Sequence, residues 1–401
     1  MTIDTDNPAL PTANPAFPRA KPIYPRYQED ADAFRIGAQR DSTFEIFDPD
    51  RHVWKLLELL DGSRDAEAAV AEMLRLHPGL TPDDVRDAIG QLDRSRLLDD
   101  GSATRYDTDP GYSRYLGNVN YFSHFLRSAD QRGAHQDRLR DTRVCLLGLG
   151  GGGSTVLQLL AGVGVGSIVA ADHDRIELTN LNRQLIYRES DVGSAKVEAA
   201  RKFLEQHNSH IQAEFVDCFI DGPQTVARLI DGADIVVCAV DEPPGIVQRF
   251  VNKACVEAAV PCVYGLSQVS RGRVFSVIPG ESGCVDCLYL HYDASDPKWA
   301  KRFRVFGDIA FRAPTLAYAP NLMRVCAELV DEVVRIRTGY LPPRSVGVQL
   351  ETDFESGTTY PLTEWRWERD PQRCPTCGSG DEKPFAERIG SPVLTSSRIS
   401  S

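Results

Sequence analysis

The chain has 401 residues, of which 42% are apolar and 25% charged, values typical of a globular protein long enough for two domains. Its formal net charge of −12 and its pI near 5.2 argue against a surface that neutralises phosphate backbones or anionic lipid. We therefore expect no nucleic acid and no membrane among its partners.

The first 26 residues are polar and rich in proline, and they lack the apolar run of a secretory signal. We expect a flexible tail over residues 1–26, another over residues 385–401, and a cytoplasmic protein. The chain has 10 cysteines. Without an export signal, metal ligands and buried small side chains are more typical roles for them than disulfides.

Residues 27–103 form the first predicted domain. Short strand-like runs, one of them at residues 44–47, precede three helix candidates. The third helix has the clearest start, with Thr81 as the N-cap and Pro82 at the first helical position. The pattern predicts a small winged-helix-like α+β module, followed by a charged linker at residues 99–111.

Residues 104–384 form the second predicted domain, in which apolar strand candidates alternate with amphipathic helical segments. This alternation predicts a Rossmann-like α/β fold, a mostly parallel sheet with helices on both faces. The uncharged run at residues 144–171 is long enough to span a bilayer. Its glycines, four of them in succession at 150–153, indicate instead a strand, a tight turn and a short helix. The strand candidates are residues 144–149, 167–171, 234–240 and 261–265.

A glycine turn follows the first of these strands. The backbone N–H groups of such a turn, and the helix N-terminus behind it, can approach a phosphate closely. Asp172 follows at about the distance expected of a ribose-binding acid. By itself this signal also fits a turn without a ligand, or a nicotinamide or flavin site. The candidate phosphate-loop residues are Gly148, Gly150, Gly151 and Gly153.

The polar segment beyond Asp172 favours one of these alternatives. It holds a polar and cationic cluster for which a dehydrogenase has no need. An enzyme in which a carboxylate attacks the α-phosphate of ATP needs fixed cations, because negative charge builds on the departing pyrophosphate. Arg183 and Lys196 suit that role, and Asp241, at the end of a parallel strand, is placed to hold Mg²⁺. Further candidate nucleotide contacts are Asp174, Asn180 and Gln184.

On these motifs, residues from about 112 to 377 resemble the ThiF/MoeB/HesA adenylyltransferase family, relatives of ubiquitin-activating enzymes. The resemblance implies that the glycine loop and Asp172 bind ATP, with Arg183, Lys196 and Asp241 as catalytic side chains. The segment Tyr112-Ser113-Arg114 is similar to the family's N-terminal motif, whose arginine reaches the ATP of the neighbouring subunit. The resemblance thus implies a homodimer with shared sites and a catalytic role for Arg114.

Two Cys-x-x-Cys pairs lie far apart in the sequence. Four thiolates in two pairs are typical of a tetrahedral structural zinc site with no open coordination position. A thioredoxin-like redox couple would need only one pair at the start of a helix. The family resemblance implies that the zinc clamps the C-terminal part of the domain to the sheet. The expected ligands are Cys284, Cys287, Cys374 and Cys377.

Many relatives carry a cysteine after the first pair, where the acyl group passes on as a thioester. Residues 288–319 contain none, so a thioester step is not expected. The basic and aromatic stretch at residues 298–304 fits either a loop that closes over an acidic peptide end or a solvated loop. The six other cysteines are expected to be small buried apolar side chains.

Residues 34–100 resemble the PqqD-like recognition element of enzymes that modify ribosomally made peptides. The match rests on the paired strands, on residues 59–62, and on Leu92 with residues 97–99. Such an element binds a leader peptide by adding it as a strand to a sheet edge. A dimerisation module or a DNA-binding winged helix is the alternative, and the acidic charge counts against DNA.

Together the two domains resemble the peptide-adenylating enzymes of microcin-type natural products. The expected reaction converts a precursor-peptide carboxylate and MgATP to an acyl-adenylate and pyrophosphate. Two other functions remain open: a leader-binding scaffold that serves a partner cyclodehydratase, and an activator of a ubiquitin-like sulfur carrier. The sequence leaves the peptide, the activated carboxylate and the fate of the acyl-adenylate unassigned.

Overall fold

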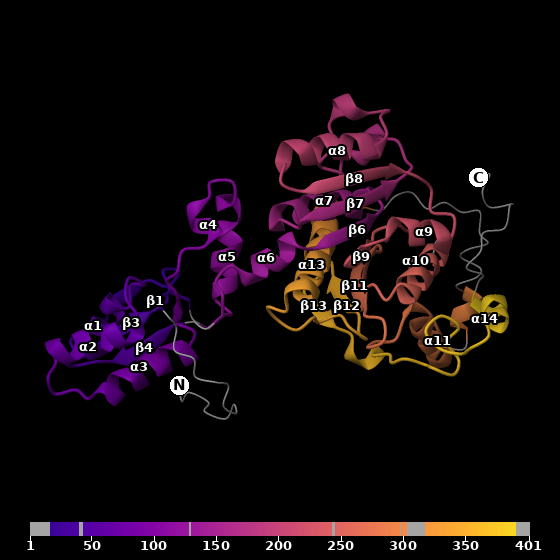
Figure 1. Ribbon diagram of the computed structural model, residues 1–401. Helices are drawn as coiled ribbons and strands as arrows, with labels where there is room; N and C mark the ends of the chain where they lie inside the picture. The colour runs from indigo at the N-terminus through magenta and orange to yellow at the C-terminus, as the bar shows by residue number, and fades with distance from the viewer. Residues whose placement is uncertain are drawn as a thin grey trace. The chain divides into compact units, whose positions relative to one another are not determined.

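The computed structural model describes residues 17–39, 43–127, 130–242, 245–296, 298–302 and 317–389. The chain forms two compact units, Met1–Asp137 and Arg138–Ser401, coloured indigo to magenta and magenta to yellow in Figure 1. The division falls after residue 137, whereas the sequence analysis placed the domain boundary after residue 103.

The first unit is an α+β fold whose described strands form two antiparallel sheets, β1 with β5 and β2 with β3 and β4. Helices α1, α2 and α3 share one apolar core with these strands. The small α+β module expected from the sequence is therefore present. Its elements are β1 (Pro18–Ala20), β2 (Arg26–Gln28), β3 (Ala33–Ile36), β4 (Phe44–Phe47), α1 (His52–Leu59), α2 (Ala66–Leu76), α3 (Pro82–Arg94) and β5 (Leu98–Asp100).

The start of α3 is fixed by local sequence. The Thr81 hydroxyl accepts a hydrogen bond from the Asp84 backbone N–H at 3.2 Å, and the Asp84 carboxylate accepts one from the Thr81 N–H at 2.8 Å. Pro82 occupies the first turn, where a missing N–H costs nothing. The predicted N-terminus of this helix is confirmed.

The first unit differs from the sequence analysis in two places, the N-terminal tail and the linker expected at residues 99–111. The tail expected over residues 1–26 is ordered from residue 17, because β1 pairs with β5 and Lys21 is 4% exposed. Lys21 Nζ donates hydrogen bonds to the backbone oxygens of Ser123 and Leu126, so the helical segment after residue 103 is tied to the module. That segment contains α4 (Arg105–Thr108), the 3₁₀ turn η1 (Ser113–Tyr115), α5 (Leu116–Ser123) and the first half of α6 (Ala134–Arg140).

The second unit is built on an eight-stranded sheet with the order β13-β12-β11-β10-β9-β6-β7-β8. The strands from β10 to β8 are parallel, as expected, and β11, β12 and β13 extend the sheet antiparallel. The strands are β6 (Arg143–Leu147), β7 (Ser167–Asp172), β8 (Gln212–Asp217), β9 (Ile235–Cys238), β10 (Cys262–Ser267), β11 (Arg271–Val277), β12 (Leu350–Asp353) and β13 (Thr359–Pro361).

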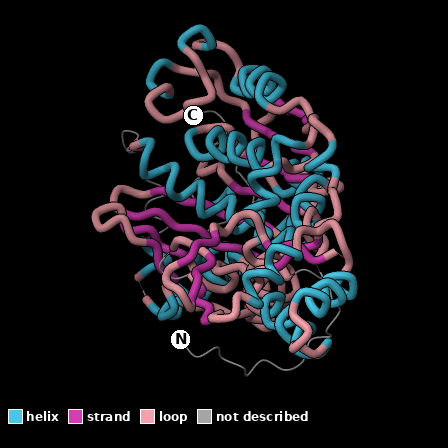
Figure 2. The backbone as a smooth tube through the Cα atoms, turned by 90° about the vertical axis from the view of Figure 1, so that its left-hand side faces the viewer, coloured by secondary structure: helices cyan, strands magenta, loops and turns pink. Residues whose placement is uncertain are grey.

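Helices cover both faces of this sheet (Figures 1 and 2). Helix α7 contacts α8 and α13 in one layer, and α10 contacts α9 and α11 in the other. The helices are α7 (Gly151–Val163), α8 (Lys196–His207), α9 (Pro223–Leu229), α10 (Ile246–Glu257), α11 (Val285–Ser295), α13 (Ala319–Thr338) and α14 (Glu382–Ile389), with 3₁₀ turns η2 (Leu178–Asn180), η3 (Glu189–Asp191) and η4 (Thr363–Trp365).

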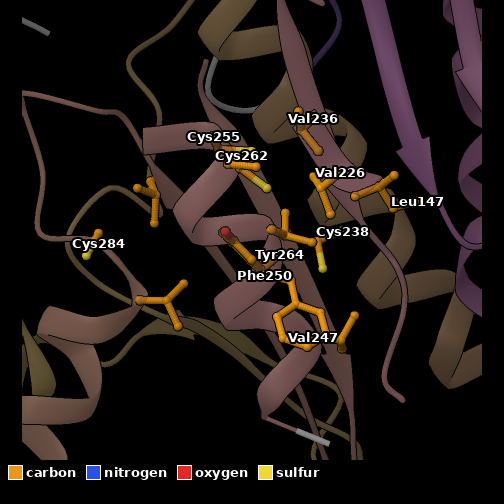
Figure 3. Close-up of a cluster of buried hydrophobic side chains, with 14 of the residues drawn as sticks. Leu147, Val226, Val236, Cys238, Val247, Phe250, Cys255, Cys262, Tyr264 and Cys284 are labelled. Atoms are coloured by element: carbon orange, nitrogen blue, oxygen red, sulfur yellow. The ribbon is translucent and has the colours of Figure 1, made fainter. Parts of the chain in front are cut away.

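The core between β9, β10 and α10 is rich in cysteine, as Figure 3 shows for Cys238, Cys255 and Cys262 around Phe250. Burial raises the pKa of Cys238 and of Cys326 to about 12. Thiols of this kind stay protonated at neutral pH and are poor nucleophiles. Of the six cysteines expected to be buried, five are, and Cys218 is partly exposed.

The tail expected to begin at residue 385 is helical up to residue 389. Helix α14 continues to Ile389, and Phe385 and Ile389 are buried in the main core. Apolar contact at this spacing fixes the helix to the domain, whereas residues 390–401 lie outside the described part. No helix in the described ranges has both the length and the apolar character of a membrane span.

Candidate functional site

The parallel strands lie in the order β8-β7-β6-β9-β10. From β6 the chain adds β7 and β8 on one side and then returns to add β9 and β10 on the other, so the switch point lies between β6 and β9. At such a switch point the two following loops leave toward opposite faces and open a crevice at the carboxyl ends of the strands. The glycine loop follows β6, and Asp241 follows β9. Both candidate motifs therefore lie at the crevice.

The glycine loop is packed too tightly for side chains at two positions. Gly148 has a φ of +96°, and a Cβ there would lie 2.7 Å from the Ala239 carbonyl oxygen. A Cβ on Gly153 would lie 1.9 Å from the Gly148 carbonyl oxygen. No side chain caps α7, whose N-cap is Gly150, so its first N–H groups are left for a ligand.

Asp172, at the end of β7, is held beside this loop by backbone hydrogen bonds. Its Oδ2 accepts from the Leu149 N–H at 2.6 Å, and its Oδ1 accepts from the Asp174 N–H at 2.8 Å. A carboxylate oxygen has further lone pairs that can accept from ribose hydroxyls. The geometry fits the predicted ribose-binding role.

Lys196, at the first position of α8, is 5% exposed, and its Nζ lies 2.6 Å from Asp174 Oδ2. The backbone reinforces the pair, since the Lys196 N–H donates to the Asp174 carbonyl at 2.9 Å. The Lys196 ammonium is nearly buried and its partner Asp174 is half-exposed. The pair is thus fixed in place and still open to a ligand on the Asp174 side.

Asp241 lies within electrostatic reach of Lys196 and Asp174. Desolvation and then Glu242 raise the pKa of Asp241, and Lys196 opposes them. The residue as a whole is exposed, so the carboxylate is partly desolvated by its neighbours yet open to a ligand on one side. Carboxylate oxygens are the ligands that Mg²⁺ prefers, so this donor fits a magnesium ion held against phosphates.

Arg183 lies over the first turn of α7. A Cβ on Gly151 would lie 3.3 Å from Arg183 Cδ. Its Nη1 donates to the Thr179 carbonyl at 3.0 Å and to Asn182 Oδ1 at 2.9 Å. The structure thus brings Arg183 to the phosphate loop, and its part in catalysis remains a prediction.

Asn180, Gln184 and Arg114 are the remaining predicted site residues. Asn180 is buried, and its Oδ1 accepts from the Glu177 N–H at the start of η2. Gln184 is 1% exposed, and its Oε1 has no hydrogen-bond partner among the described residues. Asn180 braces the segment that carries Arg183 through its bond to Glu177, whereas the buried Gln184 Oε1 keeps an unused acceptor, so the nucleotide contact predicted for Gln184 stays a prediction. Arg114 is exposed on η1 of the first unit, and its predicted action in a neighbouring subunit remains a prediction.

Tyr187 is a supporting residue that the sequence analysis missed. Its buried hydroxyl donates to the Leu149 carbonyl at 2.9 Å, so Tyr187 and Asp172 hold the carbonyl and the N–H of the same loop residue. Burial, and then the nearby Asp172, raise the pKa of Tyr187, which keeps the hydroxyl a donor. A lone aromatic in a polar segment gives no periodic signal that would have revealed this role.

The four expected zinc ligands converge. Their sulfur atoms lie within 4.8 Å of one another, with Cys287 to Cys377 at 3.3 Å and Cys284 to Cys287 at 3.9 Å. A tetrahedral zinc with bonds of about 2.3 Å needs sulfur separations of about 3.8 Å. The Asp370 N–H donates to Cys287 Sγ, as expected around a thiolate ligand. The donor set fits zinc.

An ion-pair network that the sequence analysis missed braces this knuckle. Arg249 on α10 binds Asp286, between the first two cysteines, at 2.8 and 3.1 Å, and Glu382 at 3.0 Å. Thr376, in the second pair, donates to Asp286 Oδ2 at 2.7 Å. Both charged partners at the centre are almost fully buried. The knuckle is therefore locked to α10 and α14.

The basic stretch at residues 298–304 is described only to residue 302. Trp299 packs against the rings of Tyr289 and Tyr292, each with centroids 5.4 Å away. The start of the stretch therefore packs against α11. Residues 303 and 304 lie outside the described part.

Comparison with known proteins indicates the family of this chain. A family model described as ThiF matches residues 122–376. The molybdopterin-synthase adenylyltransferase of Escherichia coli (strain K12) is 32% identical over 256 residues, 63% of this chain and 93% of that protein. The vegetative HesA protein of Trichormus variabilis is 28% identical over 265 residues, 65% of this chain and 90% of that protein.

Solved structures match more of the chain. The crystal structure of E. coli MccB with ATP has a TM-score of 0.71 and 21% identity, and covers 90% of this chain and 99% of that one. The microcin C7 biosynthetic enzyme MccB in complex with N-formylated MccA gives a TM-score of 0.72 at 21% identity and the same coverage. At this identity the likeness establishes the fold.

The parallel sheet, the glycine loop at its switch point and the named relatives define the class of this protein as an ATP-dependent adenylyltransferase. Within that class, the chain belongs to the ThiF family, whose model spans more than half of its length.

Proposed function

We propose that this protein uses MgATP to adenylate a carboxylate on a ribosomally made precursor peptide. The observation that carries the chemistry is the arrangement around the glycine loop. Asp172 accepts from the loop backbone, Arg183 lies over the first turn of α7, and Lys196 is anchored within electrostatic reach of Asp241. One bound triphosphate would touch all of them.

In the proposed step, a carboxylate oxygen of the peptide attacks the α-phosphorus, and the bond from that phosphorus to its bridging oxygen breaks. Pyrophosphate leaves with the bridging oxygen, and its growing negative charge is stabilised by Arg183 and Lys196. The N–H groups of α7 hold the phosphates, and Asp172 holds the ribose hydroxyls. Asp241 would hold Mg²⁺, which would neutralise charge on the phosphates.

A peptide substrate is favoured over a sulfur carrier because the peptide-related structures match more of this chain than the sulfur-carrier relative does. The E. coli molybdopterin-synthase relative is matched over nearly its whole length yet leaves more than a third of this chain without a counterpart. The MccB structures, one of them solved with MccA, span 90% of this chain. The additional region includes the α+β module, which supports a separate place for a leader peptide.

The module offers an edge for strand addition. β4 is an edge strand of its sheet, and Phe47 on it is 75% exposed. An extended leader paired with β4 would satisfy unpaired backbone groups and cover this ring. This assignment follows the resemblance to PqqD-like elements.

A homodimer is part of the proposal. Between β7 and α8, the segment that carries Arg183 exposes Leu178, Leu185 and Val192 at 67%, 53% and 43%. Exposed apolar side chains near a site favour a protein contact there. In such a homodimer, the family resemblance implies that Arg114 of one copy reaches the ATP of the other. The acyl-adenylate would then pass to another nucleophile or a partner modification enzyme, since residues 288–319 offer no cysteine.

Pyrophosphate exchange into ATP tests the proposal. We expect exchange only when a cognate precursor peptide is present, and we expect Asp241→Ala to abolish it while peptide binding stays near normal. Asp231→Ala, which changes an exposed carboxylate in the loop before β9, is the matched control. Exchange that responds to a ubiquitin-like sulfur carrier alone contradicts the peptide assignment, and silence with every candidate peptide favours the scaffold.

A further inference from the structure

The end of β9 lies against the glycine loop. A Cβ on Gly148 would lie 2.9 Å from Val240 Cγ1, so the residue before Asp241 packs on the turn that is proposed to bind phosphates. A small displacement of this strand end would therefore move the Asp241 carboxylate relative to a bound triphosphate. The contacts that hold the chain on either side of Asp241 thus bear on the Mg²⁺ that it would hold.

Two side-chain donors hold backbone carbonyls on these two sides. Gln248 Nε2, in the first turn of α10, donates to the Val240 carbonyl at 3.4 Å. The Tyr289 hydroxyl, on α11, donates to the Gly245 carbonyl at 3.2 Å, immediately before α10 begins. Gln248 belongs to the helix that follows Asp241 in the chain, whereas Tyr289 belongs to another helix. Tyr289 therefore ties the segment after Asp241 to a second element of the fold.

Helix α11, which carries Tyr289, is itself fixed to α10 by polar contacts. Asn252 Oδ1 on α10 accepts from the Val285 N–H at the start of α11, at 3.0 Å. One turn earlier on α10, Arg249 binds Asp286. Because α11 begins in the first cysteine pair, these contacts hold the helix and its tyrosine at the knuckle end.

The ring and the hydroxyl of Tyr289 serve different contacts. The residue is 8% exposed and its ring packs in the main core, where a phenylalanine would fill the same space. Burial, and then Asp286, raise the pKa of Tyr289, so the hydroxyl stays a donor. Burying a hydroxyl without a partner costs free energy. The bond to Gly245 offsets that cost, and it is a contact that phenylalanine could not make.

We propose that Tyr289 is a positioning residue for the adenylation step, because its hydroxyl fixes the chain after Asp241 and so orients the carboxylate that would hold Mg²⁺. The inference rests on the proposed ATP site and assigns a residue on α11 that acts through the metal-holding side chain. Through α11, the four-cysteine knuckle then supports the crevice as well as the fold.

Calorimetry of ATP binding with and without Mg²⁺ tests this inference. Tyr289→Phe should bind ATP with saturating Mg²⁺ about twofold to tenfold more weakly than the wild type, since a single hydrogen bond contributes about this much. In magnesium-free buffer the two proteins should bind ATP equally, because Asp241 then has no ion to hold. The ratio of the two affinities is the measurement, and a purely structural defect would leave it unchanged.

Tyr292→Phe is the matched control. Its hydroxyl lies on the same helix but donates to Gln349 Oε1 at 2.8 Å, so its removal should change neither ATP affinity. Metal analysis and denaturant unfolding of both variants show whether the knuckle and the fold are kept, as expected for a change that leaves each ring in place.

The outcomes separate this inference from the wider proposal. A wild type that gains affinity for ATP on addition of Mg²⁺, with the same gain in Tyr289→Phe, overturns the inference alone. Equal losses with and without Mg²⁺, or loss of zinc from Tyr289→Phe, also overturn it, because they would show that the hydroxyl only supports the fold. A wild type that binds no ATP, or binds it equally with and without Mg²⁺, overturns the proposed MgATP site together with the positioning role.

Discussion

The proposed nucleotide crevice and the four-cysteine knuckle lie in one unit and are built in opposite ways. The crevice is held by glycine backbone and by side chains that keep spare hydrogen-bonding capacity, as in the doubly engaged but accessible Asp172. The knuckle satisfies its groups internally: four cysteine sulfurs face one another, and Arg249 binds Asp286 in the core. A binding site needs unfilled positions, whereas a structural site gains stability by filling every one.

The largest effect that this comparison predicts is loss of the knuckle. Cys374→Ser, or chelation of the metal, should lower the free energy of unfolding by several kcal/mol, because structural zinc is folding energy. Chemical denaturation and metal analysis would measure this. Cys262→Ser, also at a fully buried cysteine but in β10, should keep the metal content unchanged. Unaltered stability after complete metal removal would contradict a structural role.

Breaking the buried ion pair between Arg249 and Asp286, beside the four cysteines, should have the next largest effect. Arg249→Met leaves the Asp286 carboxylate without its cation in the core, and such a loss costs about 3–5 kcal/mol. Arg373→Ala removes a partner of Asp370 whose own side chain is 66% exposed, and should cost below about 1 kcal/mol. Denaturant unfolding of both variants gives the comparison, and equal costs would show that burial of the pair has no consequence.

In the crevice, adding one methyl group at Gly153 should reduce ATP binding more than it reduces the free energy of unfolding. Gly153→Ala places a Cβ against the Gly148 carbonyl, so we expect a stability loss of about 1–3 kcal/mol and loss of ATP binding. Gly162→Ala in the same helix meets nothing within 4 Å and should stabilise the protein by about 0.5–1 kcal/mol. Tight ATP binding by Gly153→Ala, measured by calorimetry, would contradict the packing argument.

The smallest effect concerns Lys21, a buried cation held by carbonyl oxygens. Burial lowers the pKa of Lys21 to about 8, from an ordinary 10.5. The unfolded chain therefore binds more protons than the folded one between about pH 8 and 10.5, and the stability of the wild type should rise with pH across this window. Lys21→Met should lack this rise. Urea unfolding of both proteins at several pH values checks it, and parallel profiles would contradict it.

Local patterns were sufficient for much of this protein. The capping box of α3, the parallel strand candidates, the glycine loop and the two cysteine pairs are each encoded by residues a few positions apart, and the structure contains them all. Spacing also placed Asp172, Lys196 and Asp241 correctly near one crevice, because the ends of parallel strands meet at one edge of a sheet.

What the sequence determined by itself was the chemistry available: a phosphate-binding turn, an acid behind it, two cations and four thiols. Only the tertiary structure decided which groups face a ligand. It buried Gln184, ordered residues 17–26, and paired Arg249 with Asp286 at a separation of 37 residues and Lys21 with Ser123 at 102. Contacts over such distances depend on how the finished layers pack, and no periodicity in the sequence records them.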